Sequence, residues 1–352
     1  MNTNGQKPVE YKEKEIVMKK VLSLILALMM TVSFASLALA ESPIKIGVVY
    51  KQTGNPFFEA GVRGFEEAQG ELGFEFIHNG PADSSNEGQI QIIEGYIQQG
   101  VDAIAISAND AAGVVSVLQT AMDQGIKVVS WDSKVEPEGR HLNIDPSVAE
   151  NIGRVQVEEI AKQIGGEGQI AILSAGATMD NQNTWIKYMQ EELKKPEYAK
   201  IELVTIVYGD DLTDKSIQEM QGLINSYPDL KGVISPTTVG IAAAAVAIKD
   251  NGLSGKIKLT GLGLPSEMAE YLKDGTCEAM FLWNPIDLGY TAAYASVALV
   301  KGEITGAAGE KLPVGRLGEK EIMEAADGGT FTLVGDPFRF TPENIDDWKD
   351  VY

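Results

Sequence analysis

Residues 44–69 read IKIGVVYKQTGNPFFEAGVRGFEEAQ and begin with an apolar run of strand length. A short continuous apolar run bounded by turn residues is typical of a buried β-strand. The turn that follows carries Lys51 and then two adjacent aromatic residues, Phe57 and Phe58. Pro56 suits the first turn of a helix, where its missing N–H group is not needed. The stretch therefore predicts a buried strand, a turn rich in polar and aromatic side chains, and a helix.

The alternation of strand and helix continues along the chain. Segments with helical periodicity, such as residues 111–124 and 216–227, separate further apolar runs, and the pattern restarts near Pro146. Strands this apolar, covered by helices on both faces, form parallel sheets. We therefore predict an α/β fold with two doubly wound parallel-sheet lobes. The expected strands are residues 44–50, 74–78, 103–107, 127–130, 169–174, 202–208, 232–235 and 256–260.

The N-terminal region resembles a secretory leader. Residues 18–40, MKKVLSLILALMMTVSFASLALA, have a basic start, an apolar stretch and a final Ala-Leu-Ala, which together predict a signal peptide cleaved after Ala40. The apolar stretch is short for a spanning helix, which needs about 20 residues, and an uncleaved anchor is the alternative. Either Met1 or Met18 can be the start, so residues 1–40 are assigned as N-terminal extension and signal peptide. We expect a secreted, periplasmic chain without a lipid anchor, because no Cys stands directly after the predicted cleavage site.

Composition excludes several classes of protein. The single cysteine, Cys277, rules out an intramolecular disulfide and a cysteine-based metal site. The formal net charge of −21 argues against nonspecific binding to nucleic acid or to an anionic membrane surface.

No motif for catalysis, a metal or a cofactor emerges. In GLSGKIK (252–258), too few residues separate the first glycine from the Gly-Lys pair for a phosphate-binding loop. GLGLPS (261–266) lacks the third glycine of a dinucleotide-binding turn. His78 and His141 do not have metal-ligand spacing. Cys277 heads an apolar strand, where a structural thiol is the expected state.

Polar residues follow the predicted strands directly, at the positions where ligands of doubly wound sheets bind. The predicted binding site therefore lies among these residues. They are Lys51, Asn109-Asp110 and Trp131-Asp132 in the first half, and Asp180-Asn181-Gln182-Asn183, Gly209-Asp210-Asp211 and Pro236-Thr237-Thr238 in the second half.

Several long motifs resemble the ribose-type periplasmic sugar-binding proteins of ABC importers, and most closely the rhamnose-binding and autoinducer-2-binding receptors. The resemblance covers essentially the whole chain after the leader. The motifs are NPFFEAGVRGFEEAQ (55–69), GVDAIAISAND (100–110), VVSWDSKVEPEGR (128–140), NQNTWI (181–186), YGDDLTDKS (208–216), SPTTVG (235–240), TGLGLPSEMA (260–269) and WNPIDLGY (283–290).

The resemblance implies two lobes that are joined by three crossings and close on a sugar. It implies delivery to an ABC permease, and docking to a chemotaxis transducer is left open. By analogy, lobe one comprises residues 41–144 plus 265–302 and lobe two residues 145–264 plus 303–352, with hinges near 143–146, 261–265 and 302–305.

Transfer of the autoinducer-2 receptors' ligand contacts by position implies the set Lys51, Asp132, Asn181, Gln182, Pro236 and Thr238. The lysine can donate to a ring oxygen, and the aspartate can accept two vicinal hydroxyl groups through charge-assisted hydrogen bonds. The opening turn adds Asn55 as a polar contact and Phe57 and Phe58 as an apolar wall, and Trp283 is expected to stack on the sugar.

Each assignment has a structural alternative. Lys51 can instead be a solvated surface lysine. Asp132 can cap a helix, and so can either Asp180 or Asn181. One of the two phenylalanines can belong to the core, and so can Trp283.

Two departures bear on the ligand. Autoinducer-2 receptors carry an Asp where this chain has Asn181 and an Ala where it has Thr238, and both replacements fit the rhamnose-type pattern better. Ribose receptors place a second acid near residues 260–264, where this chain has none. We therefore expect a non-enzymatic receptor for rhamnose or a similar deoxysugar, with autoinducer-2 as the alternative ligand.

Two other classes of protein fit the sequence less well. A repressor of the same fold would need a DNA-binding helix-turn-helix where the leader lies, and the acidity opposes DNA contact. A sugar-converting enzyme would need a base, for which Asp132 is the only obvious candidate.

Overall fold

The computed structural model describes residue 18 and residues 42–352, so the predicted signal peptide and its cleavage site lie, except for Met18, outside the described residues. Within this part of the chain, no helix has the length and apolar character needed to cross a membrane.

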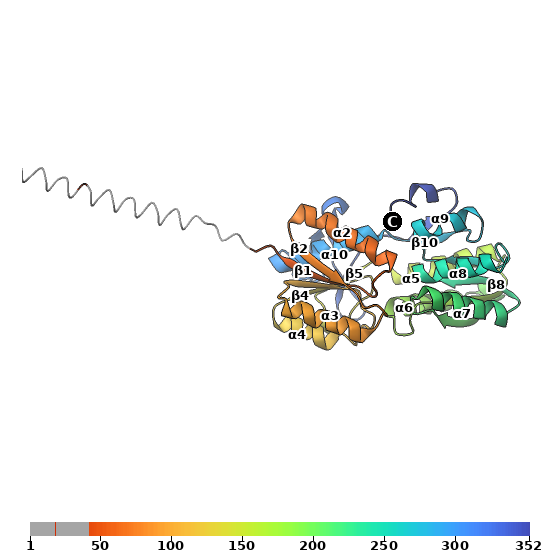
Figure 1. Ribbon diagram of the computed structural model, residues 1–352, viewed down its shortest axis with the longest axis horizontal. Helices are drawn as coiled ribbons and strands as arrows, with labels where there is room; N and C mark the ends of the chain where they lie inside the picture. Colours follow the sequence, from red (N-terminus) through yellow and green to blue (C-terminus); the bar gives the residue numbers. More distant parts are fainter. Residues whose placement is uncertain (1–17, 19–41) are drawn as a thin grey trace, which may run out of the picture. The chain divides into compact units, whose positions relative to one another are not determined.

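The first sheet has seven strands in the order β13-β14-β5-β4-β3-β1-β2. Its neighbours pair in parallel, except for the antiparallel pair β13 and β14. Figure 1 shows α2 and α10 on one face of this sheet and α3 and α4 on the other. The strands are β1 (Lys45–Val49), β2 (Glu75–Asn79), β3 (Ala103–Ile106), β4 (Lys127–Trp131), β5 (Leu142–Asp145), β13 (Met323–Glu324) and β14 (Thr330–Leu333), and the helices are α2 (Pro56–Leu72), α3 (Asn86–Gln98), α4 (Val115–Asp123) and α10 (Pro285–Lys301).

The second sheet has four parallel strands in the order β7-β6-β8-β9. Helix α5 packs with α6, and α7 packs with α8. The antiparallel pair of β10 and β15 lies beside β9. The strands are β6 (Gly168–Ser174), β7 (Ile201–Tyr208), β8 (Leu230–Ser235), β9 (Lys258–Gly261), β10 (Met280–Leu282) and β15 (Phe338–Phe340), and the helices are α5 (Ala149–Gln163), α6 (Asp180–Glu192), α7 (Thr213–Ser226), α8 (Thr238–Asp250) and α9 (Pro265–Lys273).

Short elements complete the described chain. A small hairpin packs beside α10, and single turns of 3-10 helix connect longer elements. The hairpin is β11 (Lys311–Pro313) and β12 (Glu319–Glu321), and the turns are η1 (Pro137–Gly139), η2 (Pro196–Tyr198), η3 (Gly315–Leu317) and η4 (Ile345–Asp347).

Helix α2 shows how the opening sequence sets local structure. The side-chain oxygen of Asn55 accepts a hydrogen bond from the Phe57 N–H at 3.0 Å, which caps the helix, and Pro56 occupies its first position. The helix then packs closely on α10. A Cβ at Gly64 would overlap the backbone of Ile286, so this approach requires glycine.

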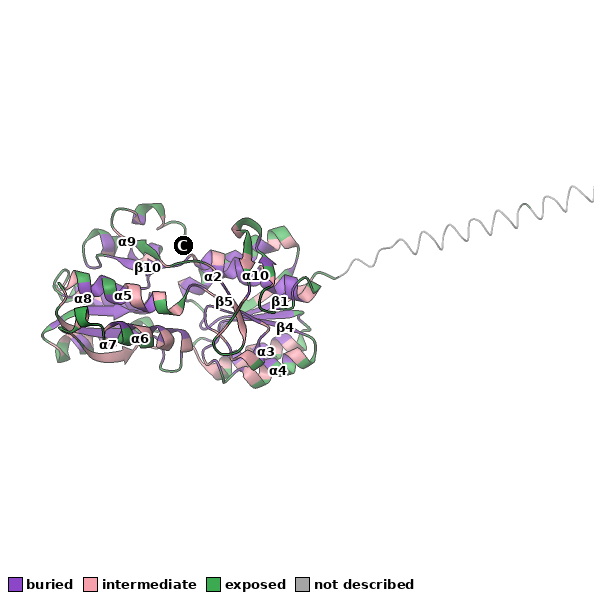
Figure 2. Ribbon diagram, turned by 180° about the vertical axis from the view of Figure 1, so that it is seen from behind, coloured by how far each residue is buried: buried purple, intermediate pink, exposed green. Residues whose placement is uncertain are grey.

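The core confirms the predicted α/β fold with parallel sheets. Ile46, Val48 and Val49 of β1 have no solvent exposure, and all four residues of β3 are equally buried. Figure 2 shows the central strands β1, β4 and β5 largely buried and the outer helix faces exposed. Strands buried on both faces read as continuous apolar runs, which is why the sequence pattern located them.

The strand pairing differs from the predicted division into lobes at two segments. Residues 265–282 were expected in lobe one, but β10 pairs with β15 and α9 packs on α8 and η4. Residues 303–333 were expected in lobe two, but β14 pairs in parallel with β5 of the first sheet. We therefore define lobe one as residues 44–145 plus 285–333, and lobe two as residues 149–282 plus 338–352.

The three crossings follow from these pairings. They run from β5 to α5, from β10 to α10, and from β14 to β15. The first overlaps the predicted hinge at 143–146, whereas the other two lie away from 261–265 and 302–305. The helix expected over 111–124 begins only at Val115, because the Asp110 side chain accepts hydrogen bonds from Ala112 N and Gly113 N and holds a turn there.

Candidate functional site

A cavity lies between the carboxyl ends of the strands of the two lobes, and we call it the first cavity. It encloses about 340 Å³ of empty space, its mouth included. Every predicted site residue except Asn181 lines it. The lining residues are Lys51, Asn55, Phe57, Phe58, Asp132, Gln182, Trp185, Asp211, Pro236, Thr237, Thr238, Leu262, Leu282 and Trp283.

Lys51 is the central cation of the first cavity. It follows β1 and is only 1% exposed, which excludes the solvated alternative. Its Nζ donates to Asn181 Oδ1 at 2.8 Å and to Gln182 Oε1 at 3.3 Å, and lies 3.8 Å from Asp132 Oδ2. Burial lowers the pKa of Lys51, and the nearby carboxylates, Asp132 first among them, oppose this effect. Lys51 thus joins lobe one to the first turn of α6 in lobe two.

A layer of buried polar side chains holds the backbone that carries Lys51. Asn109 Nδ2 donates to the Lys51 carbonyl oxygen at 2.9 Å, and Gln89 Oε1 accepts from the Asn109 N–H at 2.9 Å. Gln89 Nε2 also donates to the carbonyl oxygens of Tyr50 and Ser107, at 3.2 and 2.8 Å. These buried hydrogen bonds hold the loop in one conformation, although Asn109 Oδ1 has no partner within the described residues.

Asp132 follows β4 directly and lies opposite Lys51 in the first cavity. Its Oδ2 accepts from Ser107 Oγ at 2.8 Å. Burial raises the pKa of Asp132, an effect that Lys51 and Ser107 oppose. Its φ of 63° is left-handed, a conformation that costs a non-glycine residue about 1–3 kcal/mol and concentrates at functional sites. Asp132 caps no helix, since it lies in a bend directly after β4 and the next helical turn, η1, begins only at Pro137.

Asp211 is a lining carboxylate that the predicted ligand set lacked. It follows β7 with a φ of 53°, and Thr237 Oγ1 donates to its Oδ1. Burial raises the pKa of Asp211, while Thr237 and Lys51 act in the opposite direction. The sequence did carry a signal, because Asp211 belongs to the polar group directly after a predicted strand. Transfer of contacts from autoinducer-2 receptors left it out.

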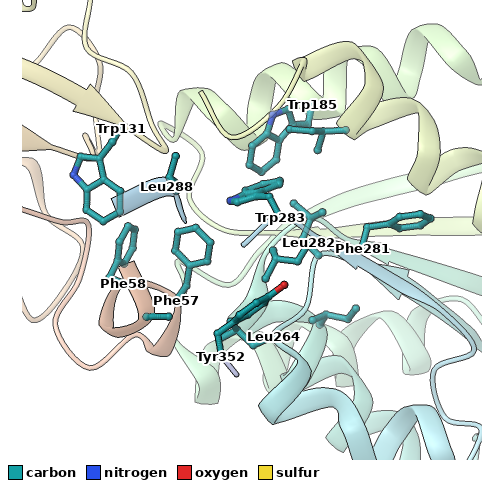
Figure 3. Close-up of a cluster of buried hydrophobic side chains, with 14 of the residues drawn as sticks. Phe57, Phe58, Trp131, Trp185, Leu264, Phe281, Leu282, Trp283, Leu288 and Tyr352 are labelled. Atoms are coloured by element: carbon teal, nitrogen blue, oxygen red, sulfur yellow. The ribbon is translucent and has the colours of Figure 1, made fainter. Parts of the chain in front are cut away.

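Four aromatic side chains form one wall of the first cavity (Figure 3). The ring of Phe57 lies 5.2 Å from that of Phe58 and 6.3 Å from that of Trp283, both edge-on. Trp283 in turn lies 5.6 Å from Trp185. Phe58 also contacts Trp131 of the core at 5.7 Å. The two phenylalanines and Trp283 therefore belong to the buried core and also line the first cavity. The prediction of an apolar cavity wall and the alternative of core residues thus both hold for them.

The remaining predicted residues lie at the starts of helices. Asn55 lines the first cavity with an oxygen already used to cap α2. Pro236 and Thr238 line it at the start of α8, and Gln182 at the start of α6. Neither Asp180 nor Asn181 caps α6, whose N-cap residue is Met179 without a side-chain bond.

Two buried donors near the first cavity have no partner within the described part of the chain. They are Nδ2 of Asn181 and Nε1 of Trp283. A buried donor without a partner is costly, so these groups suit the oxygen atoms of a bound molecule. Across residue 18 and residues 42–352, no group of three or more His, Cys, Asp or Glu side chains could hold a metal ion.

The sequence pattern of the periplasmic binding protein domain matches residues 46–304. The chain belongs to this family. The match spans both lobes and includes Lys51, Asp132 and Asp211.

Individual proteins agree with this assignment. The D-ribose/D-allose-binding protein of Pseudomonas aeruginosa is 27% identical over 275 residues, which cover 73% of this chain and 85% of that protein. An ABC transporter solute-binding protein from Clostridium phytofermentas, solved with bound L-rhamnose, is 41% identical, with a TM-score of 0.86 over 88% of this chain and 99% of that one. The LsrB protein of Clostridium saccharobutylicum, solved in complex with AI-2, is 24% identical, with a TM-score of 0.82 over 87% of this chain and 99% of that one. At this identity the similarity concerns the fold alone.

Proposed function

We propose that this chain is the extracytoplasmic receptor of an ABC importer and binds L-rhamnose or a similar neutral deoxysugar in the first cavity. The observation that carries the proposal is the pairing of groups across this cavity. Lobe one brings Lys51 and Asp132, and lobe two brings Gln182 and Asp211. One cation beside two carboxylates gives no excess of positive charge, which favours a neutral ligand over an acidic one.

Each group has a role in this proposal. Asp132 and Asp211 accept hydrogen bonds from sugar hydroxyl groups, and Lys51 and Gln182 donate to sugar oxygens. The aromatic wall of Phe57, Phe58, Trp185 and Trp283 covers the apolar C–H face and the methyl group of a deoxysugar. The L-rhamnose bound to the 41% identical clostridial protein supports this choice of ligand.

Closure of the two lobes is the proposed mechanism. Groups from both lobes meet only in the closed arrangement, so a ligand that contacts all of them shifts the population toward closure. The permease then recognises the closed receptor and takes up the sugar. No chemical step on the sugar is part of this role, and the leader predicted at residues 18–40 would direct the chain to the periplasm.

Isothermal titration calorimetry of the purified receptor tests the proposal. We expect L-rhamnose to bind, and D-ribose, D-allose and autoinducer-2 to bind more weakly or not at all. Binding of autoinducer-2 with no heat from L-rhamnose would replace the proposed ligand. No heat from any of the four would contradict the receptor assignment, and turnover of a bound sugar would contradict the non-enzymatic role.

A further inference from the structure

A second and larger cavity lies next to the first, and we call it the second cavity. It encloses about 970 Å³, counted with its opening to solvent. Asp132 and Trp185 line both cavities, and Asn181 lines the second while its oxygen accepts from Lys51 in the first. Asp132 and Trp185 therefore border both cavities, and Asn181 connects them through its hydrogen bond with Lys51.

Unpartnered donors mark the second cavity as a site for oxygen-bearing groups. Arg140 lines it and is 7% exposed, and its Nε and Nη1 have no partner within the described residues, while its Nη2 donates to Asp327 at 2.9 Å. Asn181 Nδ2 is likewise unpartnered, and so is Ser147 Oγ. Buried donors are normally satisfied, so these groups indicate an acceptor-rich occupant.

The charge of the lining opposes an acidic occupant. Lys134 and Arg140 are the cations, and they already pair with Asp327, at 3.5 and 2.9 Å, while Lys134 also lies 3.7 Å from Asp180. Asp132 and Asp145 add two further carboxyl groups. Burial raises the pKa of Asp145 to about 6, which the Asn143 hydrogen bond and the two cations oppose. The balance of charges favours a neutral ligand with hydroxyl groups.

The apolar part of the lining suits a sugar ring. Tyr188 on α6 and Phe331 on β14 line the second cavity from opposite lobes, together with Trp185. Aromatic faces pack against the C–H faces of pyranose rings, while carboxylates and amides bond the hydroxyl groups at the ring edge.

We infer that the receptor binds a rhamnose-containing disaccharide or glycoside, with the deoxysugar in the first cavity and a second neutral sugar residue in the second cavity. This inference rests on the proposed function. It assigns the second cavity to the group linked to the deoxysugar, held by Arg140, Asn181 and Tyr188.

Calorimetry with a matched set of sugars tests the inference. The ligands are L-rhamnose, and rutinose and neohesperidose, in which L-rhamnose is linked to D-glucose through O6 or O2. We expect at least one disaccharide to bind about tenfold more tightly than L-rhamnose, because a second ring fills the second cavity. Binding of L-rhamnose with no binding of either disaccharide would overturn the inference and leave the proposed function intact. Absence of binding by all three would overturn both.

Two variants separate the cavities. Tyr188→Ala removes a half-buried wall of the second cavity, and we expect it to weaken the disaccharide about tenfold and to leave L-rhamnose unchanged. Lys187→Ala, an exposed neighbour that lines neither cavity, is the control. Arg140→Lys keeps the charge beside Asp327 and removes the unpartnered guanidinium donors, so the same selective loss is expected. Equal loss of both ligands in either folded variant would contradict a separate second site.

Discussion

The lobe-one face of the first cavity holds its charged side chains on a layer of buried polar residues, whereas the lobe-two face presents amides from the first turn of a helix without a side-chain cap. Ser107 fixes Asp132, and Asn109 fixes the backbone of Lys51. Asn181, by contrast, keeps one amide donor unpartnered. The difference teaches that lobe one is organised in advance, while lobe two completes its hydrogen bonds when a ligand arrives. Substitutions on the two faces should therefore differ in effect.

Asp132→Asn should give the largest effect. The loss of a charge-assisted hydrogen-bond acceptor costs about 2 kcal/mol or more, so L-rhamnose affinity should fall at least about 30-fold. Asparagine tolerates the left-handed backbone at this position, so the fold should be retained. Calorimetry measures the effect. Asp210→Asn is a matched control, since Asp210 also has a left-handed φ but does not line the first cavity. An affinity loss no larger than that of the control would remove Asp132 from the site.

Asp211→Asn tests the lobe-two face. We expect an affinity loss of about tenfold, smaller than that of Asp132→Asn, because Asp211 is held by Thr237 rather than by a wider network. The same calorimetric titration gives the comparison. A larger loss at Asp211 than at Asp132 would reverse the proposed order of the two faces.

Thr238→Ala gives a smaller expected effect. Its hydroxyl group offers one neutral hydrogen bond, so the affinity for L-rhamnose should fall about threefold. Thr238→Ser keeps the hydroxyl group and should bind as the unchanged protein does. If Ala and Ser behave alike, the hydroxyl group does not contact the ligand.

Glu267→Gln should leave affinity unchanged and alter stability with pH. Glu267 lies on α9, outside the first cavity, and its buried Oε2 has no partner within the described residues. Burial raises its pKa from 4.5 to about 7. The unfolded chain releases the Glu267 proton at a lower pH than the folded chain does. The contribution of protonated Glu267 to the free energy of unfolding is therefore complete below about pH 4.5 and is lost as pH rises through 7.

Denaturant unfolding at two pH values tests whether the free energy of unfolding changes with pH in this direction. At pH 8 the Gln variant should be more stable than the unchanged protein by about 1–2 kcal/mol, allowing for partial exposure, and the two should converge at pH 4.5. Glu270→Gln, on the same helix with an 84% exposed side chain, serves as the control. Identical pH dependence with and without Glu267 would contradict the assignment.

The sequence predicted the fold best where strands are apolar on both faces. The eight expected strands all occur, with ends shifted by one or two residues, because β1, β3 and β6 read as continuous apolar runs. Strand β5, LNID, was not predicted as a strand, since its polar residues interrupt the run. Strands β10 to β15 are only two to four residues long, which is too short for a clear sequence pattern. The lobe to which they belong depends on the long-range pairs β10–β15 and β14–β5, so residues 265–282 and 303–333 were placed in the other lobe.

The candidate site was predicted in two ways, from the polar residues at strand ends and from the motifs that resemble sugar receptors. Lys51 and Asp132 follow β1 and β4 directly, so the rule for doubly wound sheets located them. Asp211 follows β7 by the same rule, but only the structure brings it to the first cavity. The second cavity could not be predicted, since Arg140 lies in a loop, Tyr188 on α6 and Phe331 on β14, and no sequence pattern links these segments.

A crystal structure of the receptor grown with L-rhamnose is the most direct measurement of the central claim. The account predicts one sugar in the first cavity, with its oxygens within hydrogen-bond distance of Lys51 Nζ and of the Asp132 and Asp211 carboxylates, and its apolar face on Trp283. A sugar bound to one lobe alone, or elsewhere on the chain, would contradict it.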